Sequence, residues 1–285
     1  MRTKPCRDKP TKQTYTAMDV NKVLYISQEI TPYLAPDKLS TFGKMLPQSV
    51  QEAGIEVRTF MPRYGIINER RNQLHEVIRL SGLNIVIDDT DHPLIIKVAT
   101  LQPSRMQVYF IDNDDYFQRH ATEGLETETA AEENDERSIF FVRGVLETAK
   151  KLRWIPSVIH CTGWISALAP VYLKKIYAED PAFSASKVVY SLFDAPFEGS
   201  LDKRMVEKLV MDGFKAEDLT AISSGDIDFN ALNRLAIDHA DAIAISSNNI
   251  APELIEYARQ SGKPLLEYPG EDNYTEAYSE FYRSL

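Results

Sequence analysis

The feature that most constrains this chain is an alternation of short apolar runs with segments of helical spacing. The first run is Val23 to Ser27, and a helical pattern that begins near Leu39 separates it from a second run, Val57 to Met61. Runs this rich in β-branched and aromatic residues are typical of strands buried on both faces of a parallel sheet. Strand, helix and strand in about forty residues form a βαβ unit, which predicts a parallel sheet covered by helices.

The same alternation returns later in the chain, after four β-rich runs separated by turn residues. We expect further strands at 74–80, 83–87, 94–101, 106–111, 158–161, 188–193 and 242–246. We expect further helices at 135–154, 164–177, 206–211, 229–239, 251–261 and 274–285. The fold class is therefore α/β, a doubly wound Rossmann-like parallel sheet with a β-hairpin insertion.

Several residues mark expected boundaries of these elements. Pro47 lies inside the first helical pattern and predicts a kink or a break there, and Gly54 stands where the cap at the end of that helix is expected. The acidic stretch 121–135 reads as a mobile surface loop, and Asn134 or Asp135 is expected to cap the long helix that follows.

Composition excludes several classes of protein. Hydrophobic residues make up 44% and charged residues 26% of the chain, so it can bury a core. A net charge of −10 disfavours nucleic-acid binding, which needs a basic surface. No apolar run approaches the roughly 18 residues of a membrane span. The two cysteines, Cys6 and Cys161, are far apart in sequence and favour a reducing compartment, so we expect a cytoplasmic protein.

The first residues are basic and polar and contain no apolar stretch that could act as a secretory signal. We interpret residues 1–21 as a disordered leader. The alternative is that translation starts at Met18.

Ligand chemistry in an open α/β sheet is expected outside the carboxyl ends of its strands. The chain has neither the Gly-x-Gly-x-x-Gly nor the Gly-x-x-x-x-Gly-Lys motif of phosphate-binding loops, and its five histidines and two cysteines lack metal-ligand spacing, so we expect no cofactor and no metal. The triplets 89–91 and 112–114 read Asp-x-Asp and could hold a divalent metal against a sugar diphosphate. Such triplets are also expected by chance in a chain this acidic, which favours solvated turn carboxylates.

The segment from His160 to Trp164 joins the end of an expected strand to the start of an expected helix. It has the character of a binding site, with a histidine, the hydroxyl of Thr162 and an indole in five residues. The alternative is that His160 is a core histidine and Trp164 packs the helix onto the sheet. The residues alone leave both interpretations open.

Several segments, taken in order, carry a family resemblance. They are 23–29 followed by Pro32, 46–47, 59–62, 109–112, 156–164 and 240–243. Over residues 22 to 250 the sequence resembles the N-terminal domain of bacterial glycogen synthases and plant starch synthases, which are retaining glycosyltransferases of the GT-B fold. The resemblance implies a single GT-B N-terminal domain at 22–261, with residues 262–285 as a linker and a C-terminal helix that packs on it.

The sequence departs from this family at positions that the resemblance assigns to substrate. The family's Lys-Thr-Gly-Gly-Leu loop, which meets the nucleotide diphosphate and the glucose, corresponds to 35–39, Ala-Pro-Asp-Lys-Leu. The second histidine of the family's His-x-His is Thr162, and its later His-Asn pair is Phe193-Asp194. We therefore expect no intact catalytic residue. The candidates for a degenerate substrate cleft are Glu29, Lys38, Asp112, His160, Thr162, Trp164 and Asp194.

By the resemblance, the family's C-terminal domain supplies the nucleotide pocket, and we expect no counterpart of that domain in this sequence. The last helical pattern resembles the family's terminal helix, which crosses back onto the N-terminal domain, although an ordinary amphipathic helix would look the same. The favoured function is a non-catalytic, glucan-binding accessory protein of glycogen metabolism. One alternative is a glucosyltransferase from ADP-glucose or UDP-glucose to α-1,4-glucan, completed by a partner chain. The other is a regulatory scaffold that binds no carbohydrate. The expected partners are an α-glucan, a nucleotide sugar, or a protein or second copy that covers the face of the missing domain.

Overall fold

The computed structural model describes residues 20–118 and 132–285. The strands are β1 (Lys22–Ser27), β2 (Glu56–Pro62), β3 (His75–Glu76), β4 (Leu83–Ile87), β5 (Thr90–Leu101), β6 (Met106–Asp112), β7 (Val158–Thr162), β8 (Lys187–Leu192), β9 (Ala242–Ile245) and β10 (Leu265–Leu266). The α-helices are α1 (Lys38–Glu52), α2 (Asn134–Lys151), α3 (Ala169–Val171), α4 (Met205–Met211), α5 (Phe229–His239), α6 (Pro252–Gln260) and α7 (Tyr274–Arg283).

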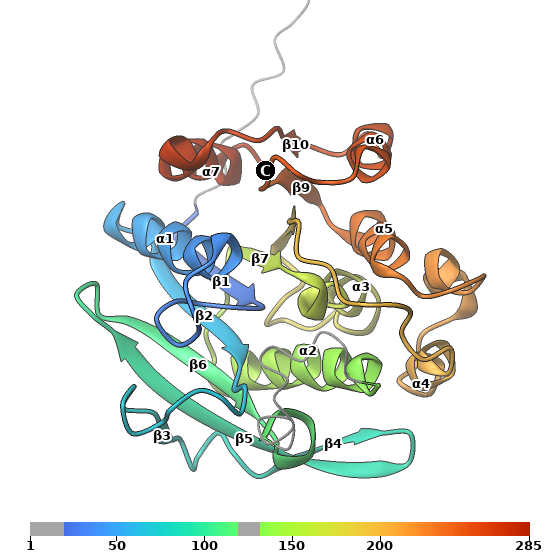
Figure 1. Cartoon of the computed structure of the whole chain (residues 1–285), viewed down its shortest axis with the longest axis horizontal. Coiled ribbons are helices and arrows are strands. Elements are labelled where there is room, and N and C mark those ends of the chain that lie inside the picture. Colours follow the sequence, from blue (N-terminus) through green and yellow to red (C-terminus); the bar gives the residue numbers. More distant parts are fainter. Residues whose placement is uncertain (1–19, 119–131) are drawn as a thin grey trace, which may run out of the picture.

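One sheet runs through the molecule in the order β10-β9-β8-β7-β1-β2-β6-β5-β3, with β4 paired to β5 (Figure 1). β1 pairs in parallel with both β2 and β7, and the parallel pairing continues from β2 to β6 and from β7 through β8 and β9 to β10. The strand order therefore reverses between β1 and β7, which is the topological switch point of a doubly wound sheet. The fold class predicted from the sequence is confirmed.

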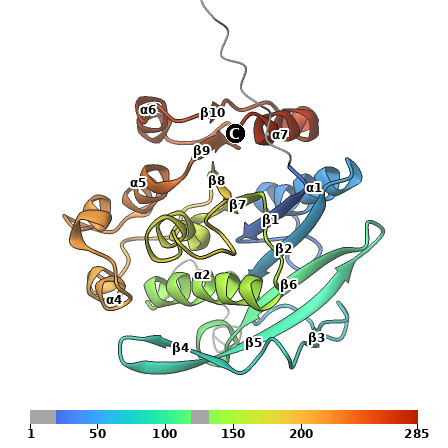
Figure 2. The same cartoon turned by 180° about the vertical axis from the view of Figure 1, so that it is seen from behind.

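Helices cover both faces of the central strands, because the two halves of the sheet are wound in opposite directions. In Figures 1 and 2, α1 lies beside α7, and α2 lies on the other side of β1 and β2. In β1 every residue from Val23 to Ser27 is buried, and in β7 every residue is buried. This double burial explains why these strands read as continuous apolar runs in the sequence.

The hairpin insertion forms the antiparallel end of the sheet. The prediction of a strand over residues 74–80 is wrong. Only His75–Glu76 pairs as a strand there, and Ile78 is 82% exposed. The reason is that β6 occupies one edge of β5, and β3 and β4 must share the other edge. On that edge β3 pairs with residues 97–98 and β4 pairs with residues 90–94. The chain must turn between the two strands, and the Leu80 amide closes that turn by donating to the carbonyl of Val77 at 2.8 Å.

Three expected helix boundaries also need correction. Of the kink or break expected at Pro47, the break is absent, because α1 continues through this residue. Gly54 lies at the end of the helix as expected, directly after the C-cap residue, with a φ of +91°. The N-cap of α2 is Glu133, one residue before the expected Asn134 or Asp135. The helix expected at 164–177 is divided into a 3-10 turn, the short α3 and a π-helical turn.

Some expectations fall outside the described residues. They include the leader up to residue 19, Cys6, and the acidic stretch as far as residue 131. Cys161 is buried and free. Within 20–118 and 132–285, no helix has both the length and the apolar character needed to cross a membrane.

Candidate functional site

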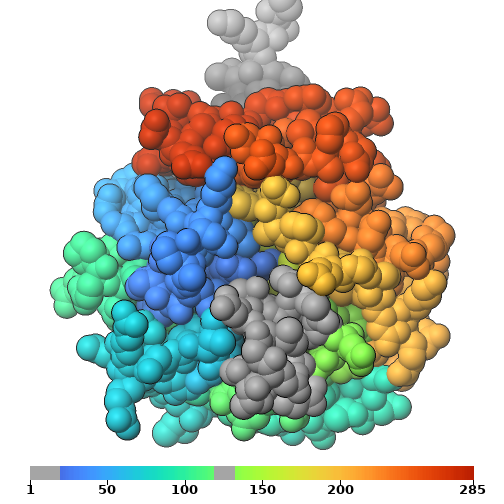
Figure 3. Space-filling view, in the orientation of Figure 1, coloured from blue at the N-terminus to red at the C-terminus, as the bar shows by residue number. Residues whose placement is uncertain are grey.

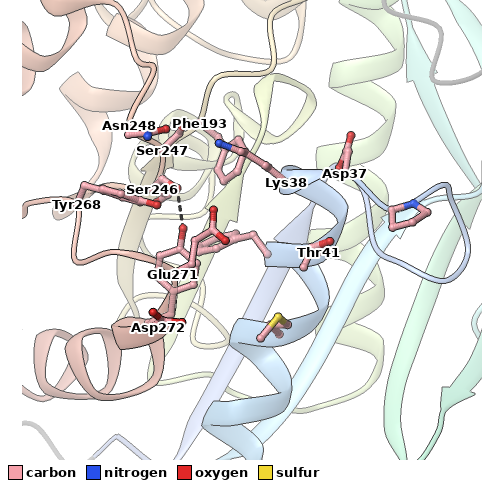
Figure 4. Close-up of a pocket in the computed structure, with 14 residues that line it drawn as sticks. Asp37, Lys38, Thr41, Phe193, Ser246, Ser247, Asn248, Tyr268, Glu271 and Asp272 are labelled. Atoms are coloured by element: carbon pink, nitrogen blue, oxygen red, sulfur yellow. Dashed lines mark hydrogen bonds between the residues drawn. The ribbon is translucent and has the colours of Figure 1, made fainter.

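A cavity of about 420 Å³ lies at the carboxyl edge of the sheet. Its walls come from the start of α1, the residues that follow β8 and β9, and the segment between β10 and α7 (Figure 4). Figure 3 shows these distant parts of the chain side by side on one face, where the blue residues meet the yellow and red ones. We call this hollow the carboxyl-edge cavity. Its size is that of a small-molecule site, and its position is where an α/β sheet binds ligands.

Aromatic side chains line one part of the carboxyl-edge cavity. The ring of Phe42 on α1 lies edge-on to Tyr274 at 5.1 Å and is 5.6 Å from Phe193. Tyr268 lies 6.3 Å from Tyr274. The Tyr274 hydroxyl donates to the carbonyl of Ser246 at 3.1 Å, so the wall has apolar faces beside polar groups.

The charges around the carboxyl-edge cavity are mostly negative. Asp37, Glu271 and Asp272 contribute carboxylates, and Lys38 is the one cation among the described residues that line it (Figure 4). The lining therefore carries more negative than positive charge. An anionic ligand such as a diphosphate is repelled by such a surface, whereas a neutral polyol is not.

The N-terminus of α1 is occupied by a carboxylate of the chain itself. The Ser40 amide donates to Asp37 Oδ1 at 2.6 Å, and the Asp37 amide donates to Ser40 Oγ at 2.9 Å, which together form a capping box. A helix N-terminus is otherwise a favourable place for a phosphate, because its free amides and the helix dipole attract negative charge. Here Asp37 already provides that negative charge.

A second hollow of about 250 Å³ lies beside the first and shares Lys38 and Asp37 with it. Asp194, Ser247 and Asn249 line this smaller hollow. The structure therefore brings together two of the candidates predicted from the sequence, Lys38 and Asp194. The other five candidates line neither hollow.

Glu29 lies just beyond the end of β1 and is only 7% exposed. Burial raises the pKa of its carboxyl to about 7, while a hydrogen bond of 3.2 Å from Gln28 Nε2 to Glu29 Oε1 opposes this rise. Gly163, at the switch point, lies close to the side chain of Gln28. A Cβ at Gly163 would lie 2.5 Å from the Cβ of Gln28, so this close approach requires glycine.

Thr162 and Trp164 are buried on either side of Gly163. The carbonyl of Thr162 accepts the Gln28 amide at 3.1 Å. The Trp164 ring lies edge-on to Phe197 at 5.3 Å, and its Nε1 has no hydrogen-bond partner within the described parts of the chain. Both residues thus join the turn after β7 to neighbouring segments.

His160 lies in the interior, beneath α7. Its Nδ1 is hydrogen-bonded to the Tyr282 hydroxyl, its Nε2 to Ser191 Oγ, and its ring stacks on Tyr278 at 5.5 Å. Burial lowers the pKa of His160 to about 3, so the imidazole is neutral. The Tyr282 hydroxyl also lies 3.2 Å from that of Tyr25 on β1. This group of hydroxyls and one imidazole, which we call the His160 core, attaches α7 to the sheet.

Asp112 is fully buried in an ionic network at the end of β6. Lys97 Nζ lies 2.7 Å from Asp112 Oδ2 and 2.6 Å from Glu69, which also pairs with Arg63. Burial raises the pKa of Asp112, and the charge of Lys97 acts against that rise. Asp112 begins one of the two Asp-x-Asp triplets. The other triplet, 89–91, begins in the tight turn between β4 and β5, where Asp89 has a φ of +63°. Across residues 20–118 and 132–285, no cluster of three or more His, Cys, Asp or Glu side chains is arranged to hold a metal ion.

Sequence reasoning did not single out the residues that the C-terminal segment brings to the carboxyl-edge cavity. They are Tyr268, Glu271, Asp272 and Tyr274. Residues 262–272 were interpreted as a linker that bridges the domain and the last helix. Tyr268 within this segment and Tyr274 just after it were the available signal, since exposed linkers are poor in aromatic residues.

The fold and the cavity define a Rossmann-like domain of the kind found in GT-B glycosyltransferases. The sequence model of the starch synthase catalytic domain matches residues 22–267. The chain therefore belongs to the glycogen and starch synthase family, and the predicted resemblance is confirmed.

Relatives and a solved structure agree with this assignment. The chain is 39% identical over 193 residues to a glycogen synthase of Chlorobium chlorochromatii, an alignment that covers 67% of this chain and 40% of that protein. It is 36% identical over 258 residues to a glycogen synthase of Chlorobium phaeovibrioides, covering 89% and 51%. The catalytic domain of Starch Synthase IV from Arabidopsis thaliana, bound to ADP and acarbose, superposes with a TM-score of 0.70 at 17% identity, covering 87% and 51%. The chain spans about half the length of the relatives it matches.

Proposed function

We propose that this chain is a non-catalytic member of its family that binds α-glucan in the carboxyl-edge cavity and acts as an accessory protein of glycogen metabolism. The observation that carries the proposal is the carboxylate of Asp37 at the N-terminus of α1, with its capping box to Ser40. By the resemblance, this loop is where family members meet the nucleotide diphosphate.

A nucleotide sugar would meet two penalties here. Its diphosphate would have to displace the Asp37 cap, which is worth about 1 kcal/mol. It would also approach the carboxylates of Glu271 and Asp272, where each close charge pair near a protein surface costs on the order of 1 to 4 kcal/mol. Lys38 alone opposes this repulsion among the described lining residues. These costs support a neutral ligand over an anionic donor.

The same lining supports a carbohydrate ligand. Tyr268 and Tyr274 offer aromatic rings, and Asp37, Ser247 and Asn248 offer groups that can bond to sugar hydroxyls. The kinship with glycogen synthases gives α-glucan as the carbohydrate. The Arabidopsis structure is bound to acarbose as well as to ADP.

The residues near the transferred sugar in the family argue against transfer in this chain. Thr162 replaces the second histidine, and it has no imidazole to offer. His160 is retained, but its two nitrogens bond to Tyr282 and Ser191 in the interior. We propose that its role is structural. This supports an accessory function rather than a glucosyltransferase that a partner chain completes.

The test is a calorimetric titration of the whole chain with maltoheptaose. We expect saturable binding, and we expect Tyr268→Ala to weaken it about tenfold, the effect of losing one aromatic contact of about 1 to 2 kcal/mol. Tyr257→Ala is the matched control, because Tyr257 lies on α6 outside the cavity lining. No binding by the wild-type chain, or equal weakening by both variants, would overturn the proposal.

Three further expectations belong to the same proposal. Residues 262–285 form a linker and a helix that pack on the domain 22–261, which the complete burial of Tyr278 and Tyr282 supports. The protein acts in the cytoplasm, in keeping with a buried free cysteine. A protein partner or a second copy that covers an exposed face stays a prediction.

A further inference from the structure

A second, chemically different hollow lies at the opposite edge of the sheet. Its volume is about 360 Å³, and three cations line it: Arg58 of β2, Arg79 of the turn after β3, and Lys151 at the end of α2. Gln107 and Tyr109 of β6 complete its polar surface. No carboxylate is found among the described residues that line it. We call it the basic hollow.

Among the residues that the structure describes, the three cations have no ion-pair partner, although the chain as a whole is acidic. None of them lies within ion-pair distance of a carboxylate in the described parts of the chain, in a protein of net charge −10. The Nη1 of Arg58 is buried and has no hydrogen-bond partner among the described residues. A buried donor of this kind is costly unless something accepts its hydrogen bond.

The arrangement of these groups is fixed by the sheet. Phe60 lies opposite Tyr109 in the β2–β6 register, and the two rings stack at 5.0 Å. Arg58 precedes Phe60 by two residues, as Gln107 precedes Tyr109, so all four side chains project from the same face. The guanidinium of Arg58 lies 4.9 Å from the ring of Trp154, and this contact orients it.

The other groups converge on the same point. Lys151 Nζ donates to the carbonyl of Leu80 at 3.0 Å, which joins the end of α2 to the turn that carries Arg79. Tyr109, Arg58 and Arg79 line the same hollow, and while burial raises the pKa of the Tyr109 phenol, the charges of the two arginines oppose this rise. The free carbonyls at the C-terminus of α2 contribute roughly half a negative charge beside Lys151. This is far less than the three positive charges that line the basic hollow, so the hollow stays positive.

We propose that the basic hollow is a binding site for a small molecule that carries a phosphate group. Guanidinium groups match phosphate oxygens in geometry and charge, and Lys151 adds a point charge. Gln107 and Tyr109 can bond to the rest of such a molecule. The ligand is thus anionic, the opposite of the ligand class that the carboxyl-edge cavity favours.

The position of the basic hollow makes it a separate site and not an extension of the carboxyl-edge cavity. Arg58 and Gln107 lie near the start of their strands, whereas the carboxyl-edge cavity follows the ends of β8 and β9. A strand of six residues spans about 20 Å, so one small ligand cannot reach both places. This inference does not depend on the proposed glucan binding.

The test is a calorimetric titration of the whole chain with inorganic phosphate and with glycerol 2-phosphate, using glycerol as the neutral control. We expect saturable binding of a phosphate species that weakens as salt rises, and none of glycerol. Tighter binding of the ester than of free phosphate would identify an organic phosphate as the ligand, and the reverse order would identify inorganic phosphate. No saturable binding of either would overturn the proposal.

Arg79 and Lys151 make suitable variants, because both residues are exposed. Arg79→Gln and Lys151→Gln should each weaken phosphate binding about tenfold, as expected for the loss of one charge-assisted hydrogen bond. Arg71→Gln removes the same charge from an exposed position outside the basic hollow, and it should leave affinity unchanged. Equal weakening by all three variants would show nonspecific attraction and would contradict a site.

Tryptophan emission gives a local readout, since the chain has two tryptophans and Arg58 lies over one of them. Phosphate should change the emission of the wild-type chain. Trp154→Phe should abolish that change while calorimetric binding remains. A change that persists in Trp154→Phe would arise from Trp164 and would place the ligand elsewhere.

Discussion

The His160 core and the rim of the carboxyl-edge cavity occupy neighbouring parts of the same sheet, but the core keeps a residue of the family whereas the rim has lost several. In the core, the family's first histidine is kept, and every polar atom of its imidazole is bonded to a neighbour. At the rim, the family's lysine and glycines are replaced, and Asp37 caps the helix in their place. Phe42 separates the two regions, since it contacts His160 on one side and lines the cavity on the other.

The difference shows which constraints act on each region. A change at His160 leaves buried hydroxyls without partners and opens a hole in a packed interior, so stability alone can preserve the residue. A change at the exposed start of α1 alters one helix cap and the charge of a surface cavity. The segments that reveal kinship are therefore largely those that maintain the fold, and kinship does not by itself carry the family's chemistry.

The largest expected effect is in the core. His160→Ala should lower the free energy of unfolding by about 3 to 5 kcal/mol, because it creates a cavity and leaves the Tyr282 and Ser191 hydroxyls unpaired. His75→Ala is the control, since His75 is exposed on β3. Urea unfolding of both variants measures the difference. A loss below about 1 kcal/mol at His160 would contradict the description of the core.

A second prediction concerns acid. The pKa of His160 is lowered to about 3 in the fold, below the ordinary 6.5, so the unfolded chain binds more protons between these values. The contribution of His160 is therefore complete above pH 6.5 and is lost as the pH falls toward 3. Between pH 7 and pH 4.5 it should cost the wild-type chain about 3 kcal/mol. Chemical unfolding at both pH values measures how far the free energy of unfolding falls. The fall should be smaller in His160→Gln by this amount, and an equal fall in the two chains would contradict the prediction.

Glu29, beside the switch point, should behave in the opposite way. Burial raises the pKa of its carboxyl from 4.5 to about 7, so the unfolded chain binds fewer protons in this window and stability falls as the pH rises through it. Glu29→Gln should stabilise the chain by about 3 kcal/mol at pH 8 and should have little effect at pH 4. Melting curves at the two pH values test this, and a variant that destabilises equally at both would contradict it.

The smallest effect is expected at the rim. Asp37→Ala removes the capping box of α1 and should cost about 1 kcal/mol, whereas Asp37→Ser should keep most of the stability because serine also caps helices well. Urea unfolding separates the two variants. Equal loss in both would mean that the carboxylate contributes through its charge rather than as a cap.

Much of the fold could be predicted because buried parallel strands leave a local signature. The runs at 23–27, 57–61 and 158–161 became β1, β2 and β7 almost residue for residue. The strand expected at 74–80 failed because its length depends on how much edge β5 leaves free, which is a tertiary property. β10 was missed because two leucines are too short a run to signal a strand.

The candidate site was less predictable than the fold. Lys38 and Asp194 do meet at the carboxyl edge, because their positions follow from strand ends and the switch point. The packing position of α7 could not be predicted from its amphipathic pattern, since Tyr278 and Tyr282 contact His160 across about 120 residues of chain. The same long-range packing brings Tyr268 and Glu271 to the carboxyl-edge cavity.

The most direct test of the central claim is a calorimetric comparison of maltoheptaose and ADP-glucose on the wild-type chain, the latter with and without magnesium. The claim is that Asp37 and its neighbours have closed the start of α1 to diphosphate while leaving a cavity suited to neutral sugar. It predicts saturable heat with maltoheptaose and none with ADP-glucose under either condition. Saturable binding of ADP-glucose, with no response to maltoheptaose, would contradict it.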